Sequence, residues 1–243
     1  AIKFIPEDSI IAEIHKDVRQ WSREDGDWKK TYARIFEKYG YDKFGGGCHI
    51  VPNHAIMVMA WCYAPDNFHK AMTIINTAGW DTDCNAANVG AVMGLVVGLD
   101  GICKDYDYRG PVADRVVVPT SEGTYGVTSC LEIAKLVARI GSKIMGYNPV
   151  SEKEKYTFSF GSQEGFVPHN LGKYENTTIS IKCNDGFIDA YASEPSGGAI
   201  AVGVSHEYTL RSEFPQGGYG VTSTPQAYSG NTIEFDVENV SAE

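Results

Sequence analysis

The sequence lacks the cysteine patterns that mark a zinc site or a disulfide-stabilised scaffold. Its six cysteines stand apart, with no Cys-x-x-Cys pair and no His-Cys cluster. Cysteines spaced in this way support neither a metal-binding finger nor a small secreted fold held together by disulfides. We therefore expect reduced thiols that are buried in the protein.

Positive charge is also scarce. The chain has 21 Lys and Arg against 31 Asp and Glu, which gives a formal net charge of −10 at pH 7. Proteins that bind nucleic acid without sequence preference need an excess of cationic side chains against the phosphates. We therefore expect no nucleic-acid partner. The sequence shows no signal peptide and no segment typical of a transmembrane helix, so no membrane partner is expected either.

The most informative stretch is GWDTDCN at 79–85, which is followed directly by the small and apolar run AANVGAVMGLVVGLDGI. Small residues recur in this run at three- and four-residue spacing, which predicts a helix with one narrow side. They are Ala87, Gly90, Ala91, Gly94 and Gly98. Each glycine costs a helix about 1 kcal/mol relative to alanine, so close approach of another helix would explain the run. We expect a buried central helix with an acidic entrance.

Two interpretations of Asp81 and Asp83 are open on local chemistry alone. An aspartate at a helix N-terminus can cap the backbone and complement the helix dipole. Two aspartates, with Thr82 between them and Asn85 behind, exceed what a cap requires. Carboxylate oxygens at this spacing also suit a hard cation such as Mg²⁺.

The stretch GWDTDCNAANVGAVMGLVVGLDGI resembles the C-terminal signature of the ADP-ribosylglycohydrolase family, in which a Gly-x-Asp-x-Asp-Thr motif opens a buried helix rich in Gly and Ala. Upstream, HIVPNHAIMVMAWCYAPDNFHKAMTIINTA resembles the two preceding helices of that family, and the resemblance covers roughly residues 1–148. It implies that Asp81 and Asp83 are the catalytic carboxylates and hold one or two Mg²⁺ ions.

The sequence departs from the family pattern at two points. Cys84 stands where the family has a threonine, and a thiol is a poor Mg²⁺ ligand, so Cys84 is a weak candidate ligand that water or Asn85 could replace. The N-terminal Ser/Thr-Asp-Asp cluster of the family has no counterpart here, because the acidic stretch at 24–27 does not match it. We expect the second half of a catalytic domain, completed by an N-terminal half that is supplied as a separate segment.

Three further residues are candidates for contact with substrate. Trp80 lies beside the acidic motif and could stack on a base or ribose, or could simply pack. His49 and Asn53 lie at a predicted helix entrance, where they could line a pocket. The alternatives are a hydrogen-bonded structural role for His49 and a helix-capping role for Asn53.

Hydrophobic periodicity predicts helices over 7–20, 28–39 and 55–63, another ending near Ala78, and a last one that starts at Thr128 or Ser129. The irregular segment between the acidic helix and the last helix is expected to be a solvated loop.

From Tyr156 the hydrophobic period changes to two, with turn residues at short intervals, which is typical of an all-β sandwich. The tail weakly resembles the closing strands of jelly-roll modules in carbohydrate-active enzymes. We therefore expect a multi-domain α and β protein: a partial, all-α ADP-ribosylglycohydrolase-like domain at 1–150, a linker at 151–155, and a jelly-roll-like β-sandwich at 156–243.

These expectations combine into a Mg²⁺-dependent hydrolase that cleaves a glycosidic bond to ADP-ribose or a related ribosyl compound, free or on an ADP-ribosylated substrate. Two alternatives remain. The chain could be a non-catalytic binding or structural member of the same fold, or a hydrolase of another glycoside with a carbohydrate-binding module.

Overall fold

A computed structural model describes residues 2–117, 127–149, 156–169, 179–192 and 203–206, with Gly230, Thr232, Glu234, Asp236 and Val237. The chain divides into two compact units, Ala1–Tyr108 and Arg109–Glu243, which we call the helical unit and the second unit. This division precedes the linker expected at 151–155, which lies outside the described residues.

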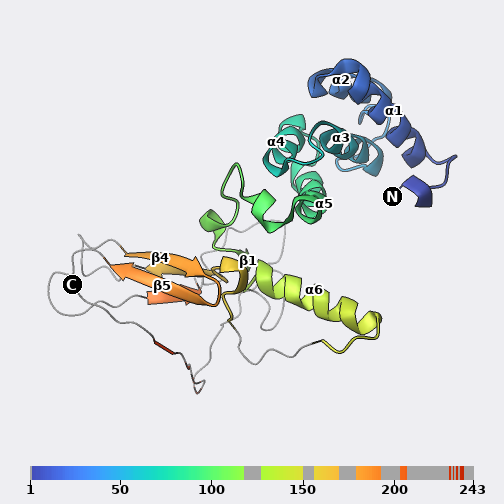
Figure 1. Cartoon of the computed structure of the whole chain (residues 1–243). Helices are drawn as coiled ribbons and strands as arrows, with labels where there is room; N and C mark the ends of the chain where they lie inside the picture. The colour runs from blue at the N-terminus through green and yellow to red at the C-terminus, as the bar shows by residue number, and fades with distance from the viewer. Residues whose placement is uncertain are drawn as a thin grey trace. The chain divides into compact units, whose positions relative to one another are not determined.

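The helical unit is coloured blue to green in Figure 1. In chain order its elements are a 3₁₀ turn (Ile2–Phe4), α1 (Ile10–Asp25), α2 (Trp28–Tyr39), α3 (Ile50–Tyr63), α4 (Phe68–Ala78) and α5 (Thr82–Ile102). The bounds predicted for α2 are confirmed. Three predicted bounds are wrong: α1 begins at Ile10 and continues through the polar break to Asp25, and α3 begins at Ile50 because the His49 side chain caps it there.

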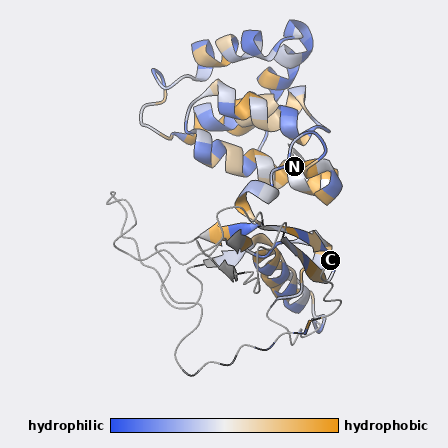
Figure 2. Cartoon of the chain, turned by 90° about the vertical axis from the view of Figure 1, so that its left-hand side faces the viewer, coloured by the Kyte–Doolittle hydropathy of each residue, from blue (hydrophilic) through white to orange (hydrophobic). Residues whose placement is uncertain are grey.

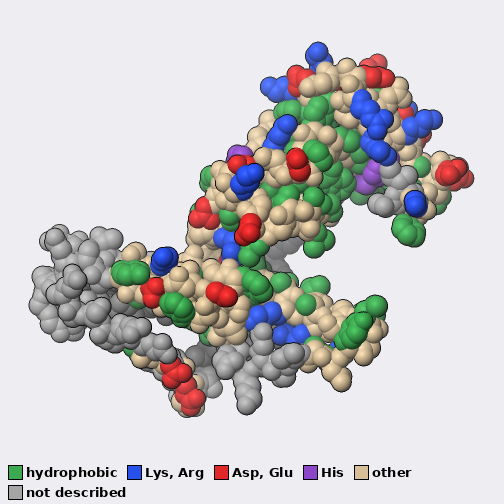
Figure 3. Space-filling view, in the orientation of Figure 1, with side chains coloured by type: hydrophobic (Ala, Val, Ile, Leu, Met, Phe, Trp, Pro, Cys, Tyr) green, Lys and Arg blue, Asp and Glu red, His purple; other side chains and the backbone are tan. Residues whose placement is uncertain are grey.

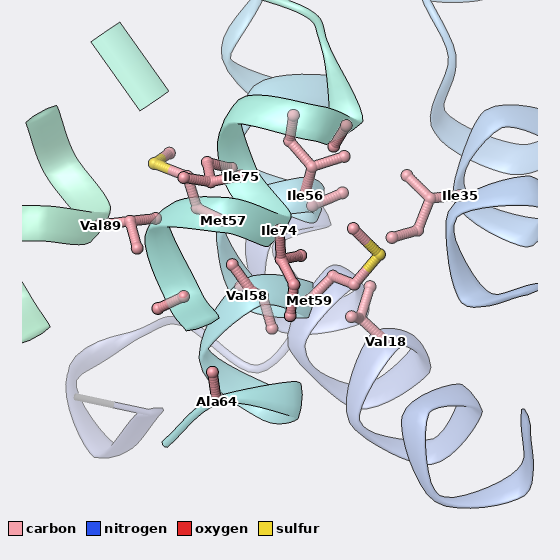
Figure 4. Packing of buried hydrophobic residues seen from close by; sticks show 14 of the residues in the cluster. Val18, Ile35, Ile56, Met57, Val58, Met59, Ala64, Ile74, Ile75 and Val89 are labelled. Atoms are coloured by element: carbon pink, nitrogen blue, oxygen red, sulfur yellow. The ribbon is translucent and has the colours of Figure 1, made fainter. Parts of the chain in front are cut away.

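Helix α3 is the central helix of this unit, and it contacts α1, α2, α4 and α5. It is hydrophobic all round, as a helix surrounded by other helices must be. Helices α1, α2 and α4 are amphipathic. Figure 2 shows hydrophilic and hydrophobic residues interspersed along the helices of this unit. Figure 4 shows Val18 and Ile35 of α1 and α2 pointing toward Met59 of α3, all three of which are buried.

The expectation that α5 is a buried central helix is wrong for the described residues. Only Asn85, Val89 and Met93 of α5 are buried, and they form a single stripe at four-residue spacing. The opposite face leaves apolar side chains in solvent, and Leu95 is 90% exposed. Hydrophobic side chains are accordingly visible on the surface around α5 in Figure 3. The α5 face, as we call it, consists of Val92, Leu95, Val96 and Leu99.

Among the described helices, α5 alone is long and apolar enough to cross a membrane, by length and composition, whereas the sequence analysis expected no transmembrane segment. Gly98 has φ +70° and interrupts the helical conformation of α5.

The second unit holds α6 (Cys130–Ile144) and short strands: β1 (Arg115–Val117), β2 (Val127–Ser129), β3 (Phe166–His169), β4 (Ile179–Asn184), β5 (Phe187–Ala192) and β6 (Gly203–His206). They pair antiparallel as β1–β2, β3–β6 and β4–β5. The β1–β2 ladder corrects the loop expected between α5 and α6. The described strands form two-stranded pairs, so the jelly-roll sandwich remains a prediction.

Residues 156–160, expected to be a strand, instead lead into a 3₁₀ turn at Ser159–Gly161, with φ of +48° at Phe158 and +58° at Phe160. The fully buried Glu164 holds this turn, because its Oε2 accepts hydrogen bonds from the backbone N–H groups of Thr157 (2.8 Å) and Phe158 (2.6 Å). Period-two hydrophobicity could not reveal a turn organised by a buried carboxylate.

All six cysteines are unpaired in the structure, but none is fully buried. Cys48, Cys84 and Cys130 are exposed, and the other three are partly exposed. The expectation of buried thiols is therefore wrong.

Candidate metal centre

A left-handed turn joins α4 to α5 and sets the direction of the acidic motif. Gly79 has φ +78° and ψ −151°, a conformation that is essentially restricted to glycine. Trp80 and Asp81 follow with φ of +53° and +52°, which costs about 1–2 kcal/mol for each residue that carries a Cβ. The buried Asn85 stabilises the turn, since its Nδ2 donates to the Trp80 carbonyl.

Asp81 occupies the N-cap position of α5, but its side chain makes no capping hydrogen bond. Its carboxylate instead accepts a 2.9 Å hydrogen bond from Nδ2 of Asn53. The capping interpretation therefore fails for the side chain of Asp81, and the strained turn directs the carboxylate away from the helix backbone.

Asn53 lies inside α3 and is 4% exposed, so the expectation that it caps the helix is wrong. Its Oδ1 accepts a hydrogen bond from the Tyr41 hydroxyl, while its Nδ2 donates to Asp81. Burial, with the negative charge of Asp81 adding to it, raises the pKa of Tyr41, which keeps the phenol protonated as a donor. Tyr41, Asn53 and Asp81 thus form a hydrogen-bonded chain.

The ligand atoms of Asp81, Asp83 and Cys84 all lie within 4.8 Å of one another. Among the described residues, this is the one group of three or more His, Cys, Asp or Glu side chains close enough to hold a metal ion. Asp81 is partly buried, whereas Asp83 and Cys84 are exposed, so the centre opens to solvent.

The two carboxylates fit Mg²⁺, and the thiol does not. Hard oxygen donors suit Mg²⁺, whereas sulfur suits softer ions. A hydrogen bond to Asp81, followed by the negative charges of Asp81 and Asp83, raises the pKa of Cys84. The sulfur therefore remains a protonated thiol, which is a weaker ligand than a thiolate.

The structure places the other predicted residues as follows. The Trp80 ring packs against Tyr32, Phe36 and Tyr41, with centroids 5.2, 5.9 and 5.2 Å away. Its observed contacts are thus with protein rings, and a substrate contact remains a prediction.

Asn85 and His49 have structural partners. The hydrogen bond from Asn85 to the turn assigns it a supporting role, and a ligand role stays untested. His49 caps α3, with Nδ1 accepting from the Val51 N–H at 3.2 Å, which is the structural alternative for this residue.

The acidic stretch at 24–27 serves the α1–α2 connection. Asp25 accepts hydrogen bonds from Thr31 and Arg34, and Asp27 caps α2 through the Lys29 N–H. These contacts agree with the expectation that this stretch does not replace the missing acidic cluster.

Sequence reasoning missed Tyr41, which contributes to the centre from the connection after α2. The only signal in the sequence was an aromatic residue beside the glycine-rich stretch at 45–47. Nothing in that pattern specified a hydrogen bond to an asparagine in the next helix.

Comparison with known proteins identifies the family. No curated protein and no solved structure matches the chain. The model of the ADP-ribosylglycohydrolase family matches residues 1–139, more than half of the 243-residue chain, and this range includes the whole centre. The chain belongs to the ADP-ribosylglycohydrolase family, a family of hydrolases.

Proposed function

We propose that this chain contributes the metal-binding half of a Mg²⁺-dependent hydrolase that cleaves a glycosidic bond to ADP-ribose or a related ribosyl compound. The observation that carries the proposal is the position of the Asp81 carboxylate. This carboxylate makes no capping hydrogen bond and accepts a hydrogen bond from Asn53 instead. Its ligand oxygen lies within 4.8 Å of a carboxylate oxygen of Asp83. A cap formed by the Asp81 side chain explains neither the missing capping bond nor the hydrogen bond from Asn53.

Asp81 and Asp83 would hold the ion. When bound, Mg²⁺ supplies charge that orients sugar hydroxyls and lowers the pKa of a water molecule. A carboxylate whose charge the ion leaves uncompensated would favour the positive charge of an oxocarbenium-like sugar. Asn53 contributes orientation, because its side-chain amide donates a hydrogen bond to one oxygen of Asp81.

The centre needs further oxygen ligands. Mg²⁺ prefers about six oxygens in near-octahedral geometry, and Asp81 and Asp83 supply only part of that number. We propose that an N-terminal half provides the remaining ligands and the general acid or base. The α5 face supports this proposal, since a solvent-exposed apolar surface of this kind marks a contact surface.

Activity of the completed protein tests the catalytic role. Asp83→Asn keeps the volume and hydrogen bonding of the side chain but removes the charge that attracts a cation. We expect loss of ADP-ribose release from an ADP-ribosylated protein, with an unchanged melting temperature. Asp100→Asn is the matched control, because Asp100 is an exposed aspartate near the other end of α5. A chelator should reproduce the Asp83→Asn loss.

Three outcomes would count against the proposal. Unchanged turnover in Asp83→Asn would remove Asp83 from the mechanism, and turnover that survives the chelator would remove the metal. Absence of turnover in the wild-type completed protein, across several ribosyl substrates, would favour the non-catalytic alternative, which the thiol of Cys84 also favours.

Association tests the role of the α5 face. Leu95→Lys places a charge on a side chain that is 90% exposed, so the free energy of unfolding of the chain alone should change by no more than about 0.5 kcal/mol. Co-purification with the N-terminal half should be lost. Retained co-purification would exclude this face as the contact surface.

A further inference from the structure

A pair of histidines lies outside the candidate metal centre and has no part in the function proposed above. His15 on α1 and His54 on α3 face each other with their Nε2 atoms 3.1 Å apart. The rings are 5.1 Å apart between centroids and meet edge to face. Both side chains are partly buried, so each retains access to solvent.

The separation of these two nitrogens matches that of two imidazoles on one metal ion. A Zn–N bond is about 2.0–2.1 Å long, so two nitrogens at octahedral or tetrahedral angles lie about 2.9–3.4 Å apart. We propose that His15 and His54 form a two-nitrogen site for a divalent transition-metal ion that prefers imidazole, such as Zn²⁺ or Ni²⁺. Water molecules would complete the coordination.

The protonation of the pair is compatible with metal binding. Burial lowers the pKa of both imidazoles. The positive charge of Arg19 lowers the pKa of His15 further, and His15 lowers the pKa of His54 further. Both rings are therefore neutral at pH 7.5. One ring now donates its Nε2 hydrogen to the other, and on binding that proton moves to Nδ1 of the same ring, so no net proton is released.

Arg19 allows a test of the direction in which metal affinity should change. It lies one turn further along α1 and acts on His15 more strongly than the N-terminal amino group does, and its charge would repel a bound metal ion. Removing its charge should therefore strengthen binding, whereas removing either imidazole should weaken it. A purely structural histidine pair would predict no change in metal affinity in either case.

Calorimetric titration with Ni²⁺ tests the site, using the full chain without a histidine tag at pH 7.5. An excess of Mg²⁺ is added so that Ni²⁺ does not bind at oxygen ligands. Mg²⁺ occupies these ligands and does not compete for imidazole. We expect one Ni²⁺ per chain. His15→Gln and His54→Gln, which keep a polar side chain of similar length, should each weaken binding about tenfold or more. Arg19→Gln should tighten it.

Controls separate this site from the acidic centre. His69→Gln removes a histidine that pairs with Tyr108, and Cys84→Ser removes the thiol beside Asp81; both variants should keep the Ni²⁺ affinity of the wild type. Circular dichroism checks that each variant is folded. A wild-type signal no larger than that of the two glutamine variants would overturn the proposal. Loss of the signal in Cys84→Ser would do so as well.

Discussion

The side-chain amide of Asn53 donates a 2.9 Å hydrogen bond to the Asp81 carboxylate, and this bond joins the central helix α3 to the turn before α5. Asn53 is buried, and its other side-chain atom accepts from Tyr41. The direction of Asp81 therefore depends on a residue that is far away in sequence and need not touch a ligand.

Replacement of Asn53 by alanine should affect both stability and metal binding. It leaves the Tyr41 hydroxyl and one Asp81 oxygen without their partner, which costs about 1–3 kcal/mol. Mg²⁺ binding to the completed protein should also weaken, as measured by calorimetry. Asn76→Ala is the control, since Asn76 is exposed and bonds only to its own helix. Equal effects of the two variants would contradict the positioning role of Asn53.

Gly79→Ala should destabilise the helical unit through the backbone alone. A Cβ at Gly79 would meet no atom within 4 Å, so the cost of about 1–3 kcal/mol comes from its φ and ψ. All four tryptophans, Trp21, Trp28, Trp61 and Trp80, lie in the helical unit, so tryptophan emission during urea unfolding reports on this unit.

The control for Gly79 is Gly90→Ala in α5. There a Cβ would make ordinary contacts with Met72 and Phe68, and alanine should stabilise the helix by up to about 1 kcal/mol. The two substitutions should therefore change the free energy of unfolding in opposite directions, and a change of the same sign would contradict the strained turn.

Cys84→Thr should strengthen Mg²⁺ binding severalfold in the completed protein. The substitution replaces sulfur by a hydroxyl oxygen, which is a harder donor. The side chain is exposed, so stability should change little. Cys84→Ala separates the gain of an oxygen from the loss of the thiol, and equal affinities of the two variants in calorimetry would argue against a ligand at position 84.

The pH dependence of the second unit should reflect Glu164. Burial raises the pKa of this carboxyl, although its two backbone hydrogen bonds oppose the shift, and its Oε1 is buried without a partner among the described residues. A pKa raised by folding means that the contribution of Glu164 to stability is complete below its unfolded pKa. This contribution is lost as pH rises through the folded pKa.

Hydrogen exchange of the 156–169 segment measures this effect, after correction for the intrinsic pH dependence of exchange. Protection in the wild type should fall as the pH rises through the folded pKa of Glu164. Glu164→Gln cannot ionise, so its protection should be flat over the same range. An identical pH dependence in both proteins would exclude Glu164 as the cause.

The sequence predicted the helices well, as the bounds of α2 show. One face of such a helix is buried, so hydrophobic residues recur in the sequence with the helical period. The prediction that α5 is buried was wrong. Small and apolar residues such as Gly94 and Leu95 indicate that a helix can pack against a partner, but they do not show whether that partner lies in the same compact unit.

The candidate centre was predicted in composition but not in arrangement. Asp81 and Asp83 were identified from their spacing together with the resemblance to the family, and the structure brings them together. The support from Tyr41 could not be predicted, because it depends on tertiary packing between segments that share no local pattern. The cap role of Asn53 was wrong for a related reason: His49, four residues earlier, caps α3 and leaves Asn53 inside the helix.

The centre separates residues that hold its shape from residues that face solvent. The buried Asn53 and Asn85 support the turn, whereas Asp83 and Cys84 lie exposed on the first turn of α5. During evolution, a single substitution at either exposed position would therefore abolish or alter the ion binding that we propose for this centre, with little penalty to folding. The same scaffold can give rise to descendants with a different metal preference, or with no chemistry at all, without first losing its fold.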